Sequence, residues 1–257
     1  PDGVRDEMLI AQWNDIDMVR SLLDEHGQDI AAVICEPLQR IIPAHKGFLA
    51  ELRAECSKAG VLLIFDEIVT GFRLDYGGAQ ERYGVVPDIV TLGKIIGGGF
   101  ALAAIGASRD LMTHFDKAVV GGDKWLMQLG TLSGNPVAAV AGLKTMEILR
   151  RPGQYDLLRA HGARFMKMQR DALNSQGIIH QIVGDETLFD VLFTETAVTN
   201  YREGQRADSA RNARYNDSLR ANGIFKSPGK LYPSLALSEE DFEVAESAFI
   251  VAARELL

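Results

Sequence analysis

The sequence predicts an α/β fold, in which helices cover a parallel sheet, followed by a smaller α+β region. In the first 150 residues, short apolar runs alternate with amphipathic segments of helical period. Strands that are apolar at nearly every position are typical of a parallel sheet with both faces covered. The pattern changes at "RRPGQ" (residues 150–154), so we expect a large domain over 1–150 and a small domain over 151–257.

The large domain is expected to contain three long helices and four strands. Apolar residues recur at helical spacing in three segments, "NDIDMVRSLLDEHG" (14–27), "GFLAELRAECSKAG" (47–60) and "NPVAAVAGLKTMEILRR" (135–151). Asn14 or Asp15 would cap the first helix, Gly60 would end the second, and Asn135–Pro136 would open the third. The expected strands of the parallel sheet are "IAAVICEP" (30–37), "VLLIFDEI" (61–68), "IVTLG" (89–93) and "ALAAIGAS" (101–108).

The small domain is expected to combine three helices with a few antiparallel strands. Its helices are "DLLRAHGARFMKMQRDALNSQG" (156–177), "ADSARNARYNDSLRANG" (207–223) and "SEEDFEVAESAFIVAARELL" (238–257). The last helix begins with a capping box, Ser238 to Asp241. The strands "IIHQIVGD" (178–185) and "LFDVLFT" (188–194) would pair around Gly184–Asp185, and "LYPSLAL" (231–237) would form one more short strand.

Composition and charge exclude several classes of function. The chain has 257 residues, 47% of them hydrophobic, and a net charge of −8, which disfavours nucleic-acid binding because phosphates need basic clusters. The histidines show no HxxxH or HExxH spacing, so no metal site is expected. No apolar run is long enough to cross a membrane, and no signal peptide is seen. Cys35 and Cys56 are expected to be reduced thiols of a cytoplasmic protein. The chain starts at Pro1 without an initiator methionine, as a piece of a longer protein would.

Lys94 is a lone charge in the stretch "IVTLGKIIGGGFALAAIGA" (89–107). No other ionisable side chain lies between Asp88 and Arg109. A buried ammonium is costly unless it is paired or loses its proton. Two interpretations stay open: the stem of Lys94 reaches out to water, or the amine is held for chemistry. Gly93–Lys94 is not a Walker A loop, because Asp88 and Ile95 stand where Gly and Ser or Thr are needed.

Polar side chains follow three expected strands, where ligands of open α/β sheets bind. They are Glu36, Asp66 and Lys94. A carboxylate such as Asp66, after five apolar residues, needs a cation or hydrogen-bond donors to stay ionised. A salt bridge from Asp66 to Lys94 or Arg73 is as compatible with the spacing as a catalytic role.

Lys94 and Asp66 together would suit a pyridoxal cofactor. Such a cofactor needs a lysine that forms a Schiff base and a carboxylate on its pyridinium nitrogen. Gly97, Gly98 and Gly99 would let the backbone approach closely. In "GTLSGNP" (130–136), the hydroxyls of Thr131 and Ser133 precede a helix, which suits a phosphate, and an ordinary helix cap is the alternative.

Four motifs resemble the class III pyridoxal-phosphate aminotransferases, which have fold type I. The motifs are "EPLQRIIPAHKGFLAELRAEC", "VLLIFDEIVTGFR", "YGVVPDIVTLGKIIGGG" and "GTLSGNPVAAVAGL". The resemblance implies a fold type I large domain, present in part, and pyridoxal 5'-phosphate bound to Lys94, with Asp66 on its pyridine nitrogen and Ile68 against its ring. It also implies that Thr131 binds the phosphate of a neighbouring subunit and that Glu36 lies near the site. The protein would then be a homodimer or higher oligomer with shared active sites.

The implied activity moves an amino group from a small-molecule amine or amino acid to a keto acid or aldehyde, in a ping-pong reaction. The segment "VLFTETAVTNYREGQRADSARNARYNDSLRANGI" is most similar to glutamate-1-semialdehyde aminomutases and their aminotransferase relatives. The aminomutases carry an acid before the last helix, whereas this chain has Lys230–Leu231–Tyr232 and no acid before Ser238. That favours an aminotransferase. An aminomutase, and a non-catalytic fragment with weak cofactor binding, remain alternatives, because the family's N-terminal portion, with its phosphate-binding turn, is not found.

Overall fold

The chain forms two compact units in the computed structural model, which describes residues 2–257. Of the described residues, the first unit comprises 2–11, 15–37 and 46–151, and the second comprises 12–14, 38–45 and 152–257. The sequence did not predict that two short segments from the first half of the chain would join the second unit.

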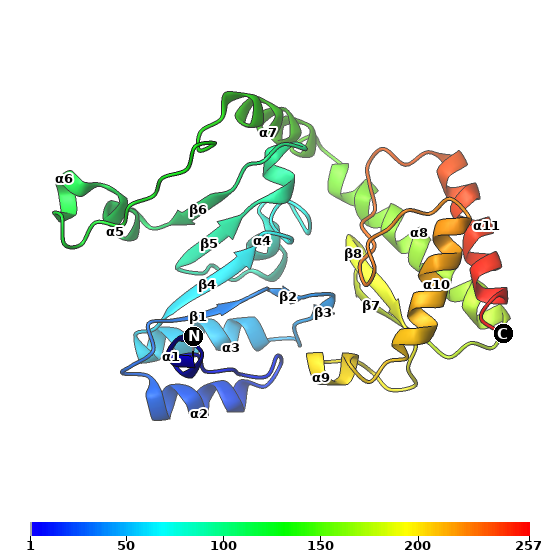
Figure 1. The fold of residues 1–257 in the computed structure, drawn as a ribbon, viewed down its shortest axis with the longest axis horizontal. Helices are drawn as coiled ribbons and strands as arrows, with labels where there is room; N and C mark the ends of the chain where they lie inside the picture. Colours follow the sequence, from blue (N-terminus) through cyan, green and yellow to red (C-terminus); the bar gives the residue numbers. More distant parts are fainter. Residues whose placement is uncertain (1) are drawn as a thin grey trace. The chain divides into compact units, whose positions relative to one another are not determined.

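The first unit is built on a four-stranded sheet with the strand order β1-β4-β5-β6 (Figure 1). The bounds of these strands are β1 Ala32–Cys35, β4 Leu62–Glu67, β5 Ile89–Leu92 and β6 Ala104–Ala107. Strands β1, β4 and β5 are parallel, as predicted, but β6 runs antiparallel to β5. A parallel crossover needs a dozen or more residues, usually with a helix. The connection from Leu92 to Ala104 is shorter and holds only the 3₁₀ turn η1 (Lys94–Gly97), so the chain turns straight back.

The predicted helices of the first unit form with the predicted caps. They are α2 (Ile16–His26), α3 (Phe48–Ala59) and α7 (Pro136–Leu149). The side chains of Asp15 and Asn135 accept hydrogen bonds from the first turns of α2 and α7, and Gly60 ends α3 in the left-handed conformation. Short helices lie outside these three, namely α1 (Asp2–Asp6), α4 (Gly78–Tyr83), α5 (Arg109–Met112), η2 (Thr113–Phe115) and α6 (Lys117–Val120).

The two faces of the sheet differ in burial. Figure 1 shows α2 and α3 along one side of it. On β4, Leu63 and Phe65 are fully buried, whereas Leu62 and Ile64 are only partly covered. Side chains alternate between the faces of a strand, so Leu63 and Phe65 share the buried face of β4, and α3 packs against this strand. The face of Ile64 and Asp66 remains partly open to solvent.

The second unit packs three helices against a hairpin. The helices are α8 (Gln154–Ser175), α10 (Ser209–Ala221) and α11 (Glu239–Arg254), and a one-turn helix α9 (Tyr201–Gly204) precedes α10. The strands β7 (Gln181–Asp185) and β8 (Leu188–Leu192) pair antiparallel, and β2 (Leu38–Gln39) pairs with β3 (Ile42–Pro43). The core includes Phe165, Phe189, Phe242 and Phe249. The capping box of α11 forms as predicted.

Two details of the second unit differ from the prediction. The β7–β8 turn lies at Glu186–Thr187, because Oδ1 of Asp185 accepts bonds from the amide and the hydroxyl of Thr187. The expected strand over 231–237 does not form. Only Leu231 makes an isolated bridge, with Phe189, and Pro233 two residues later has no N–H to continue a ladder.

Candidate active site

Asp66 lies at the carboxyl end of β4, on the partly open face of the sheet. Its side chain is half-buried and pairs in register with Thr91 on β5. Oδ1 of Asp66 accepts a hydrogen bond from the amide of Ile68 at 3.1 Å and one from the hydroxyl of Thr91 at 3.4 Å. Both bonds go to the same oxygen, so Oδ2 is left able to accept a bond from a ligand.

Lys94 lies just beyond the carboxyl end of β5, two residues after Leu92. Strands β4 and β5 are parallel neighbours, so Lys94 and Asp66 occupy the same edge of the sheet. Within residues 2–257, Asp66 makes no ion pair with Lys94 or Arg73, so the salt-bridge interpretation is wrong. The side chain of Lys94 is exposed, although its sequence neighbours are apolar, because Ile96 and Gly97 take the buried positions of the turn.

The backbone of Lys94 is in the left-handed region, with φ +50°. For a residue with a side chain, this conformation costs roughly 1–2 kcal/mol and persists only where the surroundings impose it. Such strain is concentrated at functional sites in proteins. The lysine is therefore held in a conformation that its own local preferences do not favour.

Ile68 connects the carboxylate to the lysine turn. Its amide binds Asp66, and its half-buried side chain lies beside Gly93, the residue before Lys94. A Cβ at position 93 would stand 3.0 Å from Cδ1 of Ile68. Asp66, Ile68 and Lys94 are thus the predicted site residues that the structure brings to one place.

Glu67 was not predicted as a site residue, yet it is fully buried beside Asp66. On the covered face, its carboxylate accepts bonds from the hydroxyl of Thr70 at 3.1 Å, the amide of Ala79 at 2.6 Å and the side chain of Gln80 at 3.0 Å. Glu67 thereby ties the 68–80 loop to the end of β4. The sequence signal that could have identified Glu67 was its position in the strand, one residue after Asp66. Because side chains alternate, this position points to the buried face.

Glu36 and Thr131 have less defined places. Glu36 is half-buried and follows directly after β1, at the same edge of the sheet as Asp66. Thr131 is exposed, in the turn before α7, and makes no hydrogen bond with Asp66, Ile68 or Lys94 within residues 2–257. The cap of α7 is Asn135, not Ser133. The helix-cap interpretation therefore holds for Asn135 and leaves the role of Thr131 open.

Other chemistry finds little support at this edge. Burial raises the pKa of the Cys35 thiol to about 12, and nearby Cys56, Glu36 and Asp66 add to the shift, so Cys35 is no nucleophile at neutral pH. Among the described residues there is no cluster of His, Cys, Asp or Glu that would hold a metal ion.

Within the same part of the chain, no helix is long and apolar enough to cross a membrane.

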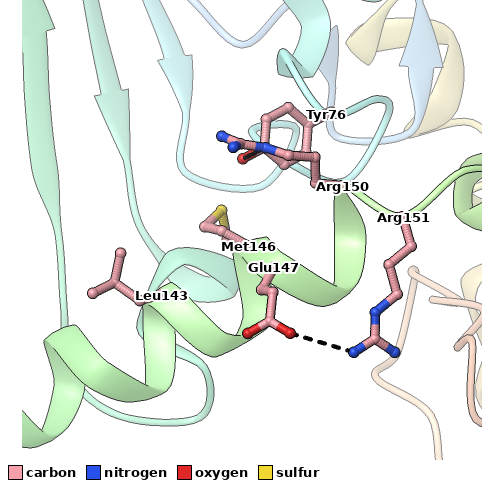
Figure 2. A pocket seen from close by; sticks show the side chains of 6 residues that line it. All are labelled: Tyr76, Leu143, Met146, Glu147, Arg150 and Arg151. Atoms are coloured by element: carbon pink, nitrogen blue, oxygen red, sulfur yellow. Dashed lines mark hydrogen bonds and ion pairs between the residues drawn. The ribbon is translucent and has the colours of Figure 1, made fainter.

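A pocket of about 390 Å³ lies elsewhere on the first unit, between α7 and Tyr76 (Figure 2). It is lined by Tyr76, Leu143, Met146, Glu147, Arg150 and Arg151. The guanidinium of Arg150 lies 5.1 Å from the centre of the Tyr76 ring, and its Nε donates to the Tyr76 hydroxyl at 3.1 Å. No predicted site residue lines this pocket, and its own polar groups are largely satisfied by one another.

The residues at the sheet edge fit a pyridoxal group. Oδ2 of Asp66 can accept the N–H of a protonated pyridine ring, and Lys94 offers an exposed primary amine at the same edge. Ile68 offers an apolar surface beside Gly93, the residue before Lys94. The donor set is the one that this cofactor chemistry requires.

Comparisons with known proteins identify the relatives of this chain. A family model described as "Aminotransferase class-III" matches residues 6–251. A glutamate-1-semialdehyde 2,1-aminomutase of Thermomicrobium roseum is 38% identical over 98% of this chain and 60% of its own length. The structure of an omega-transaminase from Sphaerobacter thermophilus superposes with a TM-score of 0.92 and 33% identity, covering 100% of this chain and 59% of that one. A structure described as a transaminase with PLP bound gives a TM-score of 0.88 and 27% identity, with the same coverage. The chain thus spans about 60% of the length of the relatives that it matches.

Proposed function

The chain belongs to the class III aminotransferases, and we propose that it carries the Schiff-base lysine of a pyridoxal-phosphate-dependent aminotransferase. The proposed reaction moves an amino group from an amine or amino acid to a keto acid or aldehyde. When bound, pyridoxal phosphate supplies an aldehyde that joins amines and a ring that accepts electrons from the substrate carbon. One observation carries the proposal: Asp66 and Lys94 lie at the same edge of neighbouring parallel strands, and Oδ2 of Asp66 is available.

The proposed roles follow from the chemistry of each side chain. Lys94 supplies the amine that holds the cofactor and carries a proton to and from the substrate carbon. Asp66 accepts the ring N–H and keeps that nitrogen protonated, while the amide of Ile68 and the hydroxyl of Thr91 orient its other oxygen. Ile68 gives an apolar wall for the ring.

Three further proposals follow from the membership of this chain in the class III aminotransferases. We assign Thr131 to the cofactor phosphate of a neighbouring subunit, and Glu36 to the border of the site. A homodimer with shared sites is supported by the segment between β6 and α7, which runs out from the sheet before it returns (Figure 1). This segment carries exposed apolar side chains, those of Leu126, Met127, Leu129 and Leu132.

We also assign the cofactor-binding large domain to residues 1–150 and the small domain to 151–257, with segments 12–14 and 38–45 of the first range packed in the second unit. A cytoplasmic location is supported by the two unpaired thiols, Cys35 and Cys56. We propose an amine or β-amino acid as the amino donor, and the likeness to the structure of a β-phenylalanine aminotransferase from Variovorax paradoxus supports the β-amino acid.

Borohydride trapping tests the proposal directly. The full-length purified protein, incubated with pyridoxal phosphate, is reduced with borohydride, digested and mapped by mass spectrometry. The cofactor should be fixed to Lys94, and the Lys94→Ala variant should remain unlabelled at that peptide. A label on Lys46, Lys124 or Lys230 in place of Lys94 would overturn the assignment.

A semialdehyde aminomutase is the second candidate, and the identity with the Thermomicrobium roseum protein favours it. The absence of an acid in "SPGKLYPSLAL" (227–237) favours the aminotransferase. The two activities differ in the acceptor. An aminotransferase passes the amino group to an added keto acid, whereas an aminomutase converts one substrate with no acceptor. Labelled amino nitrogen appearing in the added keto acid identifies the first.

A further inference from the structure

Helix α7 lies directly against the turn that carries Lys94. Gly142 is buried on this helix, and a Cβ at its position would stand 2.1 Å from the carbonyl oxygen of Ile96. From the other side, a Cβ on Gly98 would stand 2.5 Å from the carbonyl oxygen of Ala141. Both obstructions are backbone atoms, so no side-chain movement relieves them.

The conformation of the turn depends on this contact. Lys94 has φ +50° and Gly98 has φ +57°. The first residue of the turn and the residue that follows it are therefore both in the left-handed region. An exposed turn with this strain would relax unless a rigid neighbour held it. The four-turn helix α7 is such a neighbour, and its surface is hollowed where Gly142 faces Ile96.

We propose that Gly142 is a positioning residue for Lys94. Because residue 142 has no side chain, α7 can pack directly against the carbonyl of Ile96. This packing fixes the turn, which holds Lys94 at the edge of the sheet where Asp66 lies. This inference rests on the proposed function of Lys94 as the Schiff-base lysine. Gly142 itself touches neither Asp66 nor the amine of Lys94 and acts only through the turn.

A single methyl group tests the proposal. In Gly142→Ala, the turn and the helix must separate by about 1 Å to reach an ordinary contact with Ile96. A displacement of about 1 Å can lower a rate roughly a hundredfold when it misplaces a reacting group. The same change at Gly3 in α1, where no atom lies within 4 Å of the added Cβ, is the matched control. Gly98→Ala adds the methyl from the opposite side of the interface and also strains the backbone, because Gly98 has φ +57°.

The measurements use the full-length protein with pyridoxal phosphate. They are the extent of borohydride trapping on Lys94, the pH midpoint of the visible absorption band of the lysine-bound cofactor, and kcat and KM separately. For Gly142→Ala and Gly98→Ala we expect at least a tenfold loss in kcat, little change in KM for the amino donor, and a shifted pH midpoint. Gly3→Ala should match the wild type in all of them.

The outcomes separate this inference from the proposed function. If the wild type is not trapped on Lys94, the proposed function fails. If the wild type is trapped there and Gly142→Ala shows the same pH midpoint and kcat, only the positioning role is wrong. A Gly142→Ala protein that does not fold while Gly98→Ala folds with unchanged midpoint and kcat would also contradict it. If neither variant folds while Gly3→Ala does, the contact determines the fold and the positioning role is overturned.

Discussion

The hydroxyl of Thr91 lies 3.4 Å from Oδ1 of Asp66, and the two residues are partners in the register of β5 and β4. Together with the amide of Ile68, it occupies one oxygen of the carboxylate and leaves the other for a ligand. A carboxylate that accepts two hydrogen bonds on one oxygen is fixed in direction, and its other oxygen can accept a bond from a ligand. This arrangement is the basis of the first two predictions.

Asp66→Asn should slow amino transfer at least a hundredfold, equivalent to roughly 3 kcal/mol of transition-state stabilisation. A carboxamide has no charge to keep the pyridine nitrogen protonated, so the ring becomes a weaker electron acceptor. Single-turnover absorbance of the full-length enzyme measures this step. Asp110→Asn, in the first turn of α5, is the control. Wild-type rates in Asp66→Asn would reduce Asp66 to a structural anion.

Thr91→Val should lower kcat about fivefold, because the lost hydrogen bond is worth about 1 kcal/mol. The substitution keeps the shape of the side chain and removes its hydroxyl. The effect should disappear in the Asp66→Asn background, because Thr91 acts only through that carboxylate. Additive losses in the double variant would argue against the assignment. Thr196→Val, at an exposed position in the second unit, should leave kcat unchanged.

Lys226→Met should destabilise the second unit by about 3–5 kcal/mol, because it leaves the buried Asp190 without a counter-ion. Nζ of Lys226 lies 2.8 Å from Oδ2 of Asp190, and the two side chains are 6% and 1% exposed. The midpoint of urea unfolding measures the loss, and Asp190→Leu combined with Lys226→Met should recover most of it. Lys167→Met, in an exposed ion pair with Asp171, should cost no more than about 1 kcal/mol.

The cost of Lys226→Met should also decrease as the pH falls. Burial raises the pKa of the Asp190 carboxyl above its ordinary value, and removing Lys226 takes away the charge that opposes this shift. A folded state with the higher pKa binds the proton more tightly than the unfolded chain. The free energy of unfolding of the Lys226→Met variant therefore rises, relative to its value at higher pH, as the pH falls through the pKa of Asp190 in the folded state. If the difference in unfolding free energy between the wild type and Lys226→Met did not change with pH, the variant would not contain a buried, unpaired Asp190 carboxylate.

Asn14→Ala should destabilise the second unit by about 4 kcal/mol, about 3 from three lost hydrogen bonds and about 1 from backbone strain. The side-chain amide of Asn14 donates to the carbonyls of Pro43 and Thr199, and its oxygen accepts from the amide of His45. Each bond is worth about 1 kcal/mol. Asn14 also has φ +66°, so Asn14→Gly, which loses the same bonds without strain, should be less harmful by about 1 kcal/mol. Equal unfolding midpoints for the two variants would exclude the strain contribution.

Local patterns determined much of this protein in advance. The caps at Asp15, Asn135 and Ser238 formed as predicted, because a cap depends on residues a few positions apart. The parallel pairing of β1, β4 and β5 followed from continuous apolar strands separated by helices. The motifs also identified the family.

The tertiary structure decided what depends on neighbours that are distant in the sequence. The direction of β6 was set by a short connection, and the exposure of Lys94 was set by the packing of Ile96 under the turn. Segments 12–14 and 38–45 joined the second unit through contacts such as the bond from Asn14 to Thr199, 185 positions away. Likewise, the role of Gly142 becomes visible only when α7 meets the carbonyl of Ile96. The spacing of apolar residues along the chain predicts which helix or strand forms. The close approach of two backbones depends on single positions, and the spacing of apolar residues does not reveal them.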